Sequence, residues 1–287
     1  MNTIDRYAVI GAGVQHSRSP QIHSLFAKAT DQSLRYDLID VPPGDFAAAV
    51  REFFAGGGRG LNVTVPFKES ALALATELTA RARRAGAVNT LVRGGITLLG
   101  DNTDGAGLVR DLTVNLGCRL RGASVLLLGA GGAARGIIAP LLATGVQRLT
   151  IHNRHAERAQ QLAGEFADLG PVCVAALDSV NAASEANTAR PPGAAFDLII
   201  NATSASLQGQ LPQVPAHAVG PQTLCYDCAY GKSDTVFVSW ARAQGAARAV
   251  TGLGMLVEQA AESFYVWRGV RPETAPVLVA LQQNIQT

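Results

Sequence analysis

Two glycine-rich stretches of the sequence could each bind the pyrophosphate of a dinucleotide: VIGAGVQHSRSP at 9–20 and VLLLGAGGAARG at 125–136. Such a loop needs a helix that begins inside the glycine run, so that helix N–H groups meet the phosphates, and a small residue where helix and strand pack. In the first stretch that position is His16, and Pro20 favours a helix that begins near the proline instead. The second stretch has the required small residues at Gly129, Gly131 and Ala134. We therefore predict that the second stretch binds the cofactor.

Basic residues follow this second loop in the stretch IHNRHAERA at 151–159. At the end of the next strand, a carboxylate binds the ribose 2′-hydroxyl of NAD, whereas basic side chains accommodate the 2′-phosphate of NADP. Asn153, Arg154 and Arg158 lie here, and no carboxylate precedes Glu157. Guanidinium groups bind phosphate well because their donors form a rigid fork. The pattern favours an NADP site over the alternative of an ordinary solvated helix start.

Polar residues recur in the first half of the chain where predicted strands end. Hydroxyls, amides, one lysine and one carboxylate suit a small polyhydroxylated acid better than an apolar ligand. Taken singly, each residue also has an ordinary interpretation as a helix cap, a solvated lysine or a turn residue. The residues are Ser17, Ser19, Asn62, Thr64, Lys68, Asn89 and Asp104.

The composition excludes several classes of protein. The 287 residues are 48% hydrophobic and 16% charged, which indicates a globular chain long enough for two domains. A net charge of +2 without a basic run does not indicate nucleic-acid binding. Glycine, arginine and proline break the apolar stretches, and the opening MNTIDRY is unlike a signal peptide. We therefore expect no membrane segment and a cytoplasmic location.

Four cysteines stand at Cys118, Cys173, Cys225 and Cys228. The last two form a CxxC, but they lie in TLCYDCAY, which is typical of a strand, where residues three apart face opposite ways. No second pair completes a zinc site, and the histidines show no ligand spacing. We expect reduced cysteines and no metal.

Short apolar strands alternate with helical segments along the chain, which predicts an α/β fold with a parallel sheet covered on both faces. In the first hundred residues we expect one helix over 68–86 and a hairpin around Gly94-Gly95. The pattern restarts at about 106. The stretch 178–195 is poor in large apolar residues and is expected to be an exposed connection. Two helices, over 252–270 and 275–286, end the chain.

Nine blocks in the same order resemble the shikimate dehydrogenase family across nearly the whole chain: HSRSPQIH, GLNVTVPFKE, AGAVNTL, GDNTDG, GAGGAARG, NRHAERA, NATSAS, YDCAYG and GLGMLVEQAAESF. The resemblance implies that Lys68 and Asp104 are the catalytic pair and that Ser17 and Ser19 hold a substrate carboxylate. The implied partners of the substrate hydroxyls are Asn62, Thr64, Asn89, Asp104 and Gln259, with Tyr230 nearby. The implied NADP residues are Gly129, Ala130, Gly131, Gly132 and Ala133 at the pyrophosphate, Asn153, Arg154 and Arg158 at the 2′-phosphate, and Cys228 and Gly252 at the nicotinamide end.

The same resemblance implies two α/β domains: a substrate domain of 1–105 completed by 253–287, and a Rossmann-type NADP domain of 106–252. The implied reaction is the reversible NADPH-dependent reduction of 3-dehydroshikimate to shikimate, a step of aromatic amino acid biosynthesis, and the resemblance allows a homodimer. An alcohol carbon that loses a hydride must also lose its hydroxyl proton, which requires a base. Lys68 beside Asp104 fits this need, and the sequence leaves open which of the two carries the proton. No metal is required, because the cofactor does the redox chemistry.

The chain departs from the usual family pattern at five positions, where proline, threonine, glycine, methionine and proline are usual: Gly13, His155, Ser206, Cys228 and Val236. Two of these, Gly13 and Ser206, adjoin expected ligand loops, so an enzyme acting on quinate or another cyclic acid with NAD is one alternative. The absence of a carboxylate beside Arg154 argues against NAD. A non-catalytic ligand sensor on the same fold is a second alternative, and the retention of Lys68 and Asp104 argues against it.

Overall fold

In the computed structural model, strand β1 (Asp5–Gly11) alternates its side chains between two layers of helices. Ala8 and Ile10 join one buried cluster, whereas Tyr7 and Val9 join another on the opposite face. This alternation is the period of two that a strand buried on both faces requires. The strand that leads into the first glycine stretch is therefore a central strand.

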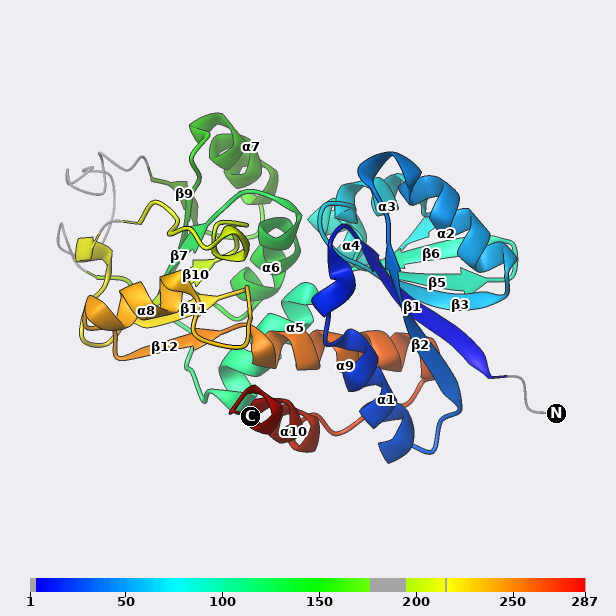
Figure 1. Cartoon of the computed structure of the whole chain (residues 1–287). Coiled ribbons are helices and arrows are strands. Elements are labelled where there is room, and N and C mark those ends of the chain that lie inside the picture. Colours follow the sequence, from blue (N-terminus) through cyan, green and yellow to red (C-terminus); the bar gives the residue numbers. More distant parts are fainter. Residues whose placement is uncertain (1–3, 176–194, 215, 287) are drawn as a thin grey trace. The chain divides into compact units, whose positions relative to one another are not determined.

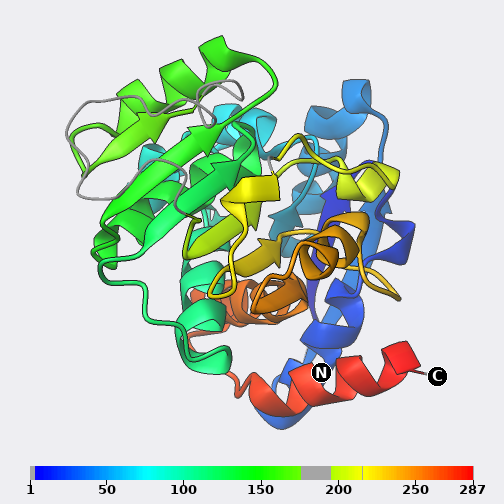
Figure 2. The same ribbon diagram turned by 90° about the vertical axis from the view of Figure 1, so that its left-hand side faces the viewer.

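The structure describes residues 4–175, 195–214 and 216–286, and these form two compact units. The first unit runs up to Asp111 and resumes at Gly254, and the second comprises Leu112–Leu253. The boundary expected from the sequence, 105/106, lies inside helix α5 (Asp104–Arg110). Both units are drawn in Figure 1 and, turned by 90°, in Figure 2.

The first unit contains a six-stranded sheet with the order β2-β1-β3-β5-β6-β4. The remaining strands of this unit are β2 (Leu34–Asp40), β3 (Gly58–Val63), β4 (Glu77–Leu78), β5 (Thr90–Gly94) and β6 (Thr97–Asp101). Its helices are α1 (Ser19–Ala29), α2 (Phe46–Ala55), α3 (Lys68–Leu74), α4 (Ala80–Ala85), α5, α9 (Leu253–Arg268) and α10 (Ala275–Gln286). Helix α10 lies beside α1 (Figure 2). The C-terminal helices thus belong to the same unit as the N-terminal strands.

The second unit contains a parallel sheet with the order β12-β11-β10-β7-β8-β9. Its strands are β7 (Ser124–Leu128), β8 (Arg148–His152), β9 (Val172–Val174), β10 (Leu198–Asn201), β11 (Leu224–Asp227) and β12 (Arg248–Thr251). Its helices are α6 (Gly132–Ala143), α7 (Ala156–Phe166) and α8 (Val236–Ala243). The strand order reverses between β7 and β10, which is the topology of a doubly wound dinucleotide-binding fold. The α/β class and the Rossmann-type unit predicted from the sequence are confirmed.

One predicted element is wrong, because the helix expected over 68–86 is broken into α3, the short strand β4 and α4. Thr76 exchanges hydrogen bonds with Leu98, its N–H donating to the Leu98 carbonyl and its hydroxyl accepting from the Leu98 N–H, each at 2.8 Å. Thr79 then caps α4 by accepting from the N–H of Ala82 at 3.2 Å. Threonine side chains that bond to the backbone compete with helix formation, and here the helix is interrupted between α3 and α4.

Two other local predictions are confirmed. Strands β5 and β6 pair antiparallel, and Gly95 in their turn has a φ of +67°, which glycine adopts without strain. Helix α1 begins at Ser19 with Pro20 in its first turn, so no helix begins at the first glycine pair. The expected connection over 178–195 lies outside the described residues, except for its last position.

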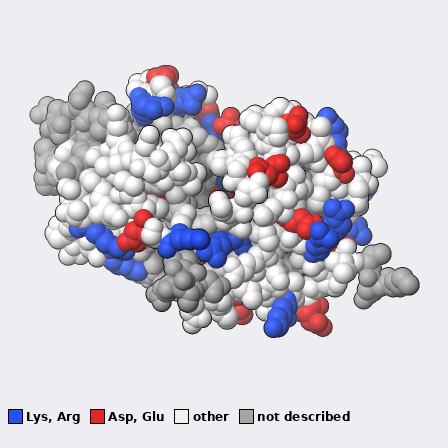
Figure 3. Space-filling model, viewed as in Figure 1, with Lys and Arg blue, Asp and Glu red and all other residues white. Residues whose placement is uncertain are grey.

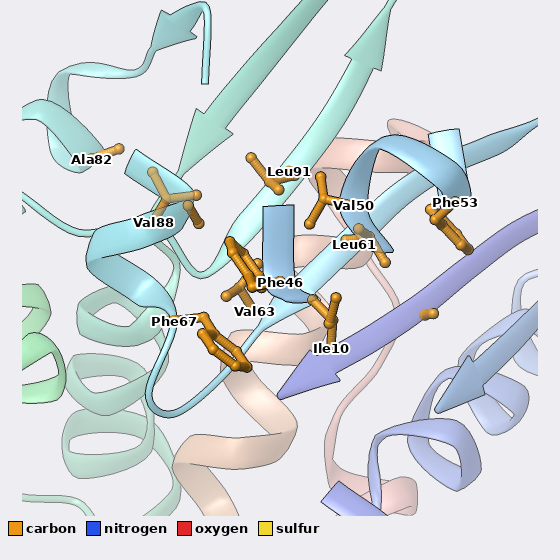
Figure 4. Close-up of a cluster of buried hydrophobic side chains, with 12 residues drawn as sticks. Ile10, Phe46, Val50, Phe53, Leu61, Val63, Phe67, Ala82, Val88 and Leu91 are labelled. Carbon is orange, nitrogen blue, oxygen red and sulfur yellow. The ribbon is translucent and has the colours of Figure 1, made fainter. Parts of the chain in front are cut away.

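An apolar core holds the strands of the first unit that carry the polar motifs. Phe46, Val50 and Phe53 of α2 pack over Leu61 and over neighbouring strand residues, as Figure 4 shows.

On the face drawn in Figure 3, basic and acidic side chains are interspersed. Among the described residues, no helix combines the length and the apolar character needed to cross a bilayer.

His23 of α1 is fully buried in the aromatic layer on the opposite face of the same sheet. Its ring stacks on Tyr36, with centroids 4.2 Å apart and 7° between the ring planes. Trp267 of α9 lies at a centroid distance of 5.3 Å. Burial lowers the pKa of His23 to about 3, and the side chain of Asn62 opposes part of this effect. The imidazole is therefore neutral in the folded protein at physiological pH.

We predict that His23 makes the free energy of unfolding depend on pH between pH 7 and pH 5. The unfolded chain binds a proton at His23 below its ordinary pKa of 6.5, whereas the folded chain does not until the pKa of about 3. Stability is therefore lost as the pH falls, by about 2 kcal/mol from this group. Urea unfolding should show that His23→Phe loses less stability than wild type over this range by that amount. The same substitution at the exposed His16 is the control, and an unchanged pH dependence in His23→Phe would refute the assignment.

Candidate active site

A buried ion pair joins the first residues of two helices in the first unit. Nζ of Lys68, at the start of α3, lies 2.5 Å from Oδ2 of Asp104, at the start of α5. The side chains are only 14% and 6% exposed. The positive end of a helix favours the Asp104 carboxylate and disfavours the Lys68 ammonium. The Asp104 carboxylate therefore supplies the Lys68 ammonium with a partner of opposite charge at this helix start.

Asn89 holds the other oxygen of that carboxylate. Its Nδ2 donates to Oδ1 of Asp104 at 2.8 Å and to Oγ1 of Thr103 at 2.9 Å. Its Oδ1 accepts from the N–H of Thr103 at 2.8 Å. The backbone of Asn89 is fixed as well, because its N–H donates to Asp101 and its carbonyl accepts from Val63. Both oxygens of Asp104 thus accept hydrogen bonds, one from Lys68 and one from Asn89.

Gln259 of α9 lies at the edge of the same network. Its Oε1 is 3.4 Å from Nδ2 of Asn89 and 3.4 Å from Oγ1 of Thr103, while its Nε2 donates to the carbonyl of Leu256 at 2.8 Å. The side chain is partly exposed. The helix that returns from the C-terminal part of the chain therefore brings Gln259 to the Lys68–Asp104 pair.

Asn62, at the end of β3, makes internal hydrogen bonds on both sides of its amide. Its Nδ2 donates to Oγ of Ser263 at 2.9 Å and lies 3.2 Å from Oγ1 of Thr90, and its Oδ1 accepts from the hydroxyl of Tyr36 at 2.8 Å. The side chain of Asn62 is thus engaged by protein partners on both sides of its amide. Sequence reasoning missed the supporting hydroxyls of Thr90, Thr103 and Ser263. Thr90 and Thr103 lie directly beside Asn89 and Asp104, and that adjacency was the available signal.

The serines of the first glycine stretch bond to each other: Oγ of Ser17 lies 3.2 Å from Oγ of Ser19. The loop before them is anchored at Gly13, whose φ is +74° and whose N–H donates to Oδ1 of Asp40 at 2.7 Å. That bond holds the pKa of Asp40 below its usual value. A proline at Gly13 could make neither this φ nor this bond, so the loop has its own conformation here. The base of the loop packs on Thr64, since a Cβ on Gly11 would lie 2.5 Å from its Cγ2.

In the second unit, the predicted cofactor loop has the geometry of a phosphate cradle. Gly129 has a φ of +108°, and a Cβ there would lie 3.1 Å from the carbonyl oxygen of Ala202. Gly131 is the N-cap of α6 with no side-chain cap, and a Cβ on it would meet nothing within 4 Å. The first residues of α6, Gly132 and Ala133, present their N–H groups at this open end. These residues fit a pyrophosphate, which needs close backbone approach and free helix N–H groups.

The basic residues predicted to choose the cofactor lie at the end of β8 and on the first turns of α7. Arg154 and Arg158 are exposed, and within the described part of the chain neither is paired with a carboxylate. Nδ2 of Asn153 donates to the carbonyl of His155 at 3.0 Å, which shapes the turn between strand and helix. The two guanidinium groups are therefore available to an outside anion.

The structure brings Cys228 and Gly252 together. A Cβ on Gly252 would lie 2.5 Å from the carbonyl oxygen of Cys228, so only glycine fits. Tyr230 follows in the same loop and is partly exposed. It belongs to the second unit, whereas the other predicted substrate residues all lie in the first. Burial raises the pKa of Cys225 to about 12, and none of the four cysteines, all of which lie in the described part of the chain, forms a disulfide. Among the described residues, no group of His, Cys, Asp or Glu could hold a metal ion.

Three family models match the chain. The shikimate dehydrogenase substrate binding domain matches residues 9–91, shikimate / quinate 5-dehydrogenase matches 112–208, and the shikimate 5′-dehydrogenase C-terminal domain matches 252–282. The first match contains Lys68, and the third contains Gln259. Together they cover most of both units.

Individual proteins are similar over almost the full length. The chain is 54% identical over 286 residues to a shikimate dehydrogenase (NADP(+)) of Aeromonas hydrophila, with 99% of this chain and 100% of that one covered. Among solved structures, an Ael1 enzyme from Pseudomonas putida is 44% identical with a TM-score of 0.86, covering 96% of this chain and 98% of that chain. A shikimate 5-dehydrogenase of Thermus thermophilus, solved with NADP(H) and shikimate, is 30% identical with a TM-score of 0.83, covering 98% and 99%.

Proposed function

Because the chain belongs to the shikimate dehydrogenase family, we propose that it catalyses the reversible reduction of 3-dehydroshikimate to shikimate with NADPH. The observation that carries the proposal is the buried Lys68–Asp104 pair with Asn89 bonded to its carboxylate. A positioned lysine and carboxylate in a network of amides and hydroxyls suit proton transfer on a polyhydroxylated ring.

We assign the transferred proton to Lys68 and an orienting role to Asp104. Both carboxylate oxygens already accept hydrogen bonds, from Lys68 and from Asn89. The Lys68 ammonium has three donor positions, and within the described part of the chain one of them bonds to Asp104, so it can also donate to a ketone oxygen. In the reverse direction, neutral Lys68 accepts the hydroxyl proton of shikimate as the hydride leaves. Asp104 then stabilises the ammonium that forms.

The remaining polar residues would bind the substrate. We assign its carboxylate to Ser17 and Ser19, which already lie within hydrogen-bond distance of each other. We assign its hydroxyls to Asn62, Thr64, Asn89 and Gln259, with Tyr230 nearby. Polar groups that are held by protein partners lose little conformational freedom on binding, so their hydrogen bonds are effective.

The second unit would bind NADP. The residues from Gly129 to Ala133 would hold the pyrophosphate, Asn153, Arg154 and Arg158 would bind the 2′-phosphate, and Cys228 and Gly252 would lie at the nicotinamide end. When bound, the cofactor supplies the hydride that the ketone receives. The cytoplasmic location and the homodimer expected from the sequence stay predictions, as does a place in aromatic amino acid biosynthesis.

One prediction of the proposed function concerns the acid–base group. Lys68→Ala should lower kcat for shikimate oxidation by about 10²- to 10⁴-fold, because a positioned proton-transfer group is lost. The affinity for NADPH, measured by fluorescence titration, should change little. Lys28→Ala, which removes an exposed lysine of α1, is the matched control. If Lys68→Ala keeps more than half of the wild-type turnover, Lys68 is not the proton carrier.

Another prediction of the proposed function concerns the choice of cofactor. Arg154→Ala should raise KM for NADP by about 10-fold or more, because a charge-assisted bond to the 2′-phosphate is lost, and should leave the use of NAD nearly unchanged. Initial rates with both cofactors measure this difference. Arg119→Ala, which removes another exposed arginine of the same unit, is the control. Equal damage to both cofactors would mean that Arg154 serves the fold instead.

A further inference from the structure

A second buried carboxylate, that of Asp227 at the end of β11, organises two loops of the NADP unit. Asp227 is 0% exposed. Its Oδ1 accepts from Nδ2 of Asn201 at 3.1 Å and from the N–H of Ala229 at 3.0 Å. Its Oδ2 accepts from the hydroxyls of Ser206 and Thr235, both at 2.6 Å. We propose that Ser206 is a positioning residue, which latches the loop 202–209 to Asp227 and so shapes that loop for NADP.

The hydroxyl of Ser206 closes a three-membered ring of hydrogen bonds. It donates to Asp227 and accepts from Nδ2 of Asn201 at 3.1 Å, and the same Nδ2 also donates to Asp227. Nδ2 carries two hydrogens, so each has one acceptor. Removal of the hydroxyl leaves one amide hydrogen without its acceptor and one carboxylate oxygen with a single donor. Both atoms are buried or nearly so, which makes their loss of partners costly.

Hydrogen bonds hold the loop 202–209 at its start, at Thr203, and near its middle, at Ser206. Oδ1 of Asn201 accepts from the N–H of Thr203 at 3.1 Å and from the hydroxyl of Thr203 at 2.7 Å, which holds the start of the loop. Ser206 begins a short 3₁₀ turn, Ser206–Gln208, whose last two residues are exposed. Thr235 and Ala229 bind the same carboxylate from the loop after β11. One carboxylate therefore couples the loop 202–209 to the loop that contains Cys228 and Tyr230.

This loop lies where the fold binds dinucleotides. In doubly wound sheets, ligands bind outside the carboxyl ends of the strands at the point where the strand order reverses. Here that point is between β7 and β10, and the loop 202–209 follows β10. The loop also contacts the glycine loop, since a Cβ on Gly129 would lie 3.1 Å from the carbonyl oxygen of Ala202. A shift of the loop would therefore change the surface that the proposed cofactor contacts.

The inference rests on the proposed function, and Ser206→Ala tests it with two readouts. In the free protein, amide hydrogen exchange within 202–209 should become about 10-fold faster, because a local opening is no longer opposed by the latch. The Kd for NADPH without substrate should rise by about 10-fold or more. Ser206→Thr, which keeps a hydroxyl, should show the wild-type exchange rate and the wild-type Kd. Ser204→Ala, which removes an exposed hydroxyl of the same loop, is the control and should change neither.

The outcomes separate the inference from the proposed function. An unchanged Kd in Ser206→Ala, with or without faster exchange, would overturn the role of Ser206 while leaving the function intact. Equal weakening in Ser204→Ala would also overturn it, because the effect would then not be specific to the latch. Wild-type protein that fails to bind NADPH would overturn the proposed function itself.

Discussion

The ion pair between Lys68 and Asp104, which is largely shielded from water, is the interaction around which the polar residues of the first unit are arranged. Lys68 and Asp104 are stable in this place only if the hydrogen-bonding capacity of both is satisfied, because a buried charge without partners is costly. Asn89 supplies the second bond to the carboxylate, and Thr103 in turn fixes Asn89. The residues that satisfy this ion pair therefore come from strand ends and helix starts of the unit.

The arrangement around the pair reflects how the sheet is built. Strand β3 ends just before Thr64. Asn89 directly precedes β5 and Asp104 follows β6, and the antiparallel pairing of these two strands brings the two residues together. Helix α9 returns from the C-terminal part of the chain and adds Gln259 and Ser263. The NADP unit satisfies its own buried carboxylate differently, since Asp227 is surrounded by neutral donors from two loops. In each unit, one carboxylate forms hydrogen bonds with segments that are distant in the sequence.

Sequence patterns predicted much of this because local signals and the fold agree. The small residues at Gly129 and Gly131, and the bulky His16 in the first stretch, distinguished the two glycine loops, and α1 indeed begins at Ser19. The single helix expected over 68–86 was wrong, because the hydroxyl of Thr76 bonds to a strand that is distant in the sequence. The partners of Ser206 and Ser263 could not be predicted either, since their hydrogen bonds join residues that only the tertiary fold brings together. The assigned roles of the site residues stay predictions.

An initial-rate assay of the wild-type protein shows directly whether the chain oxidises shikimate with NADP. Shikimate and quinate are each combined with NADP and with NAD, and formation of reduced cofactor is followed by absorbance. We expect the highest kcat/KM for shikimate with NADP, by about 10-fold or more over each other combination, because charge-assisted bonds to the 2′-phosphate and a fitted substrate site act together. A preference for quinate or for NAD, or no turnover of any pair by folded protein, would contradict it.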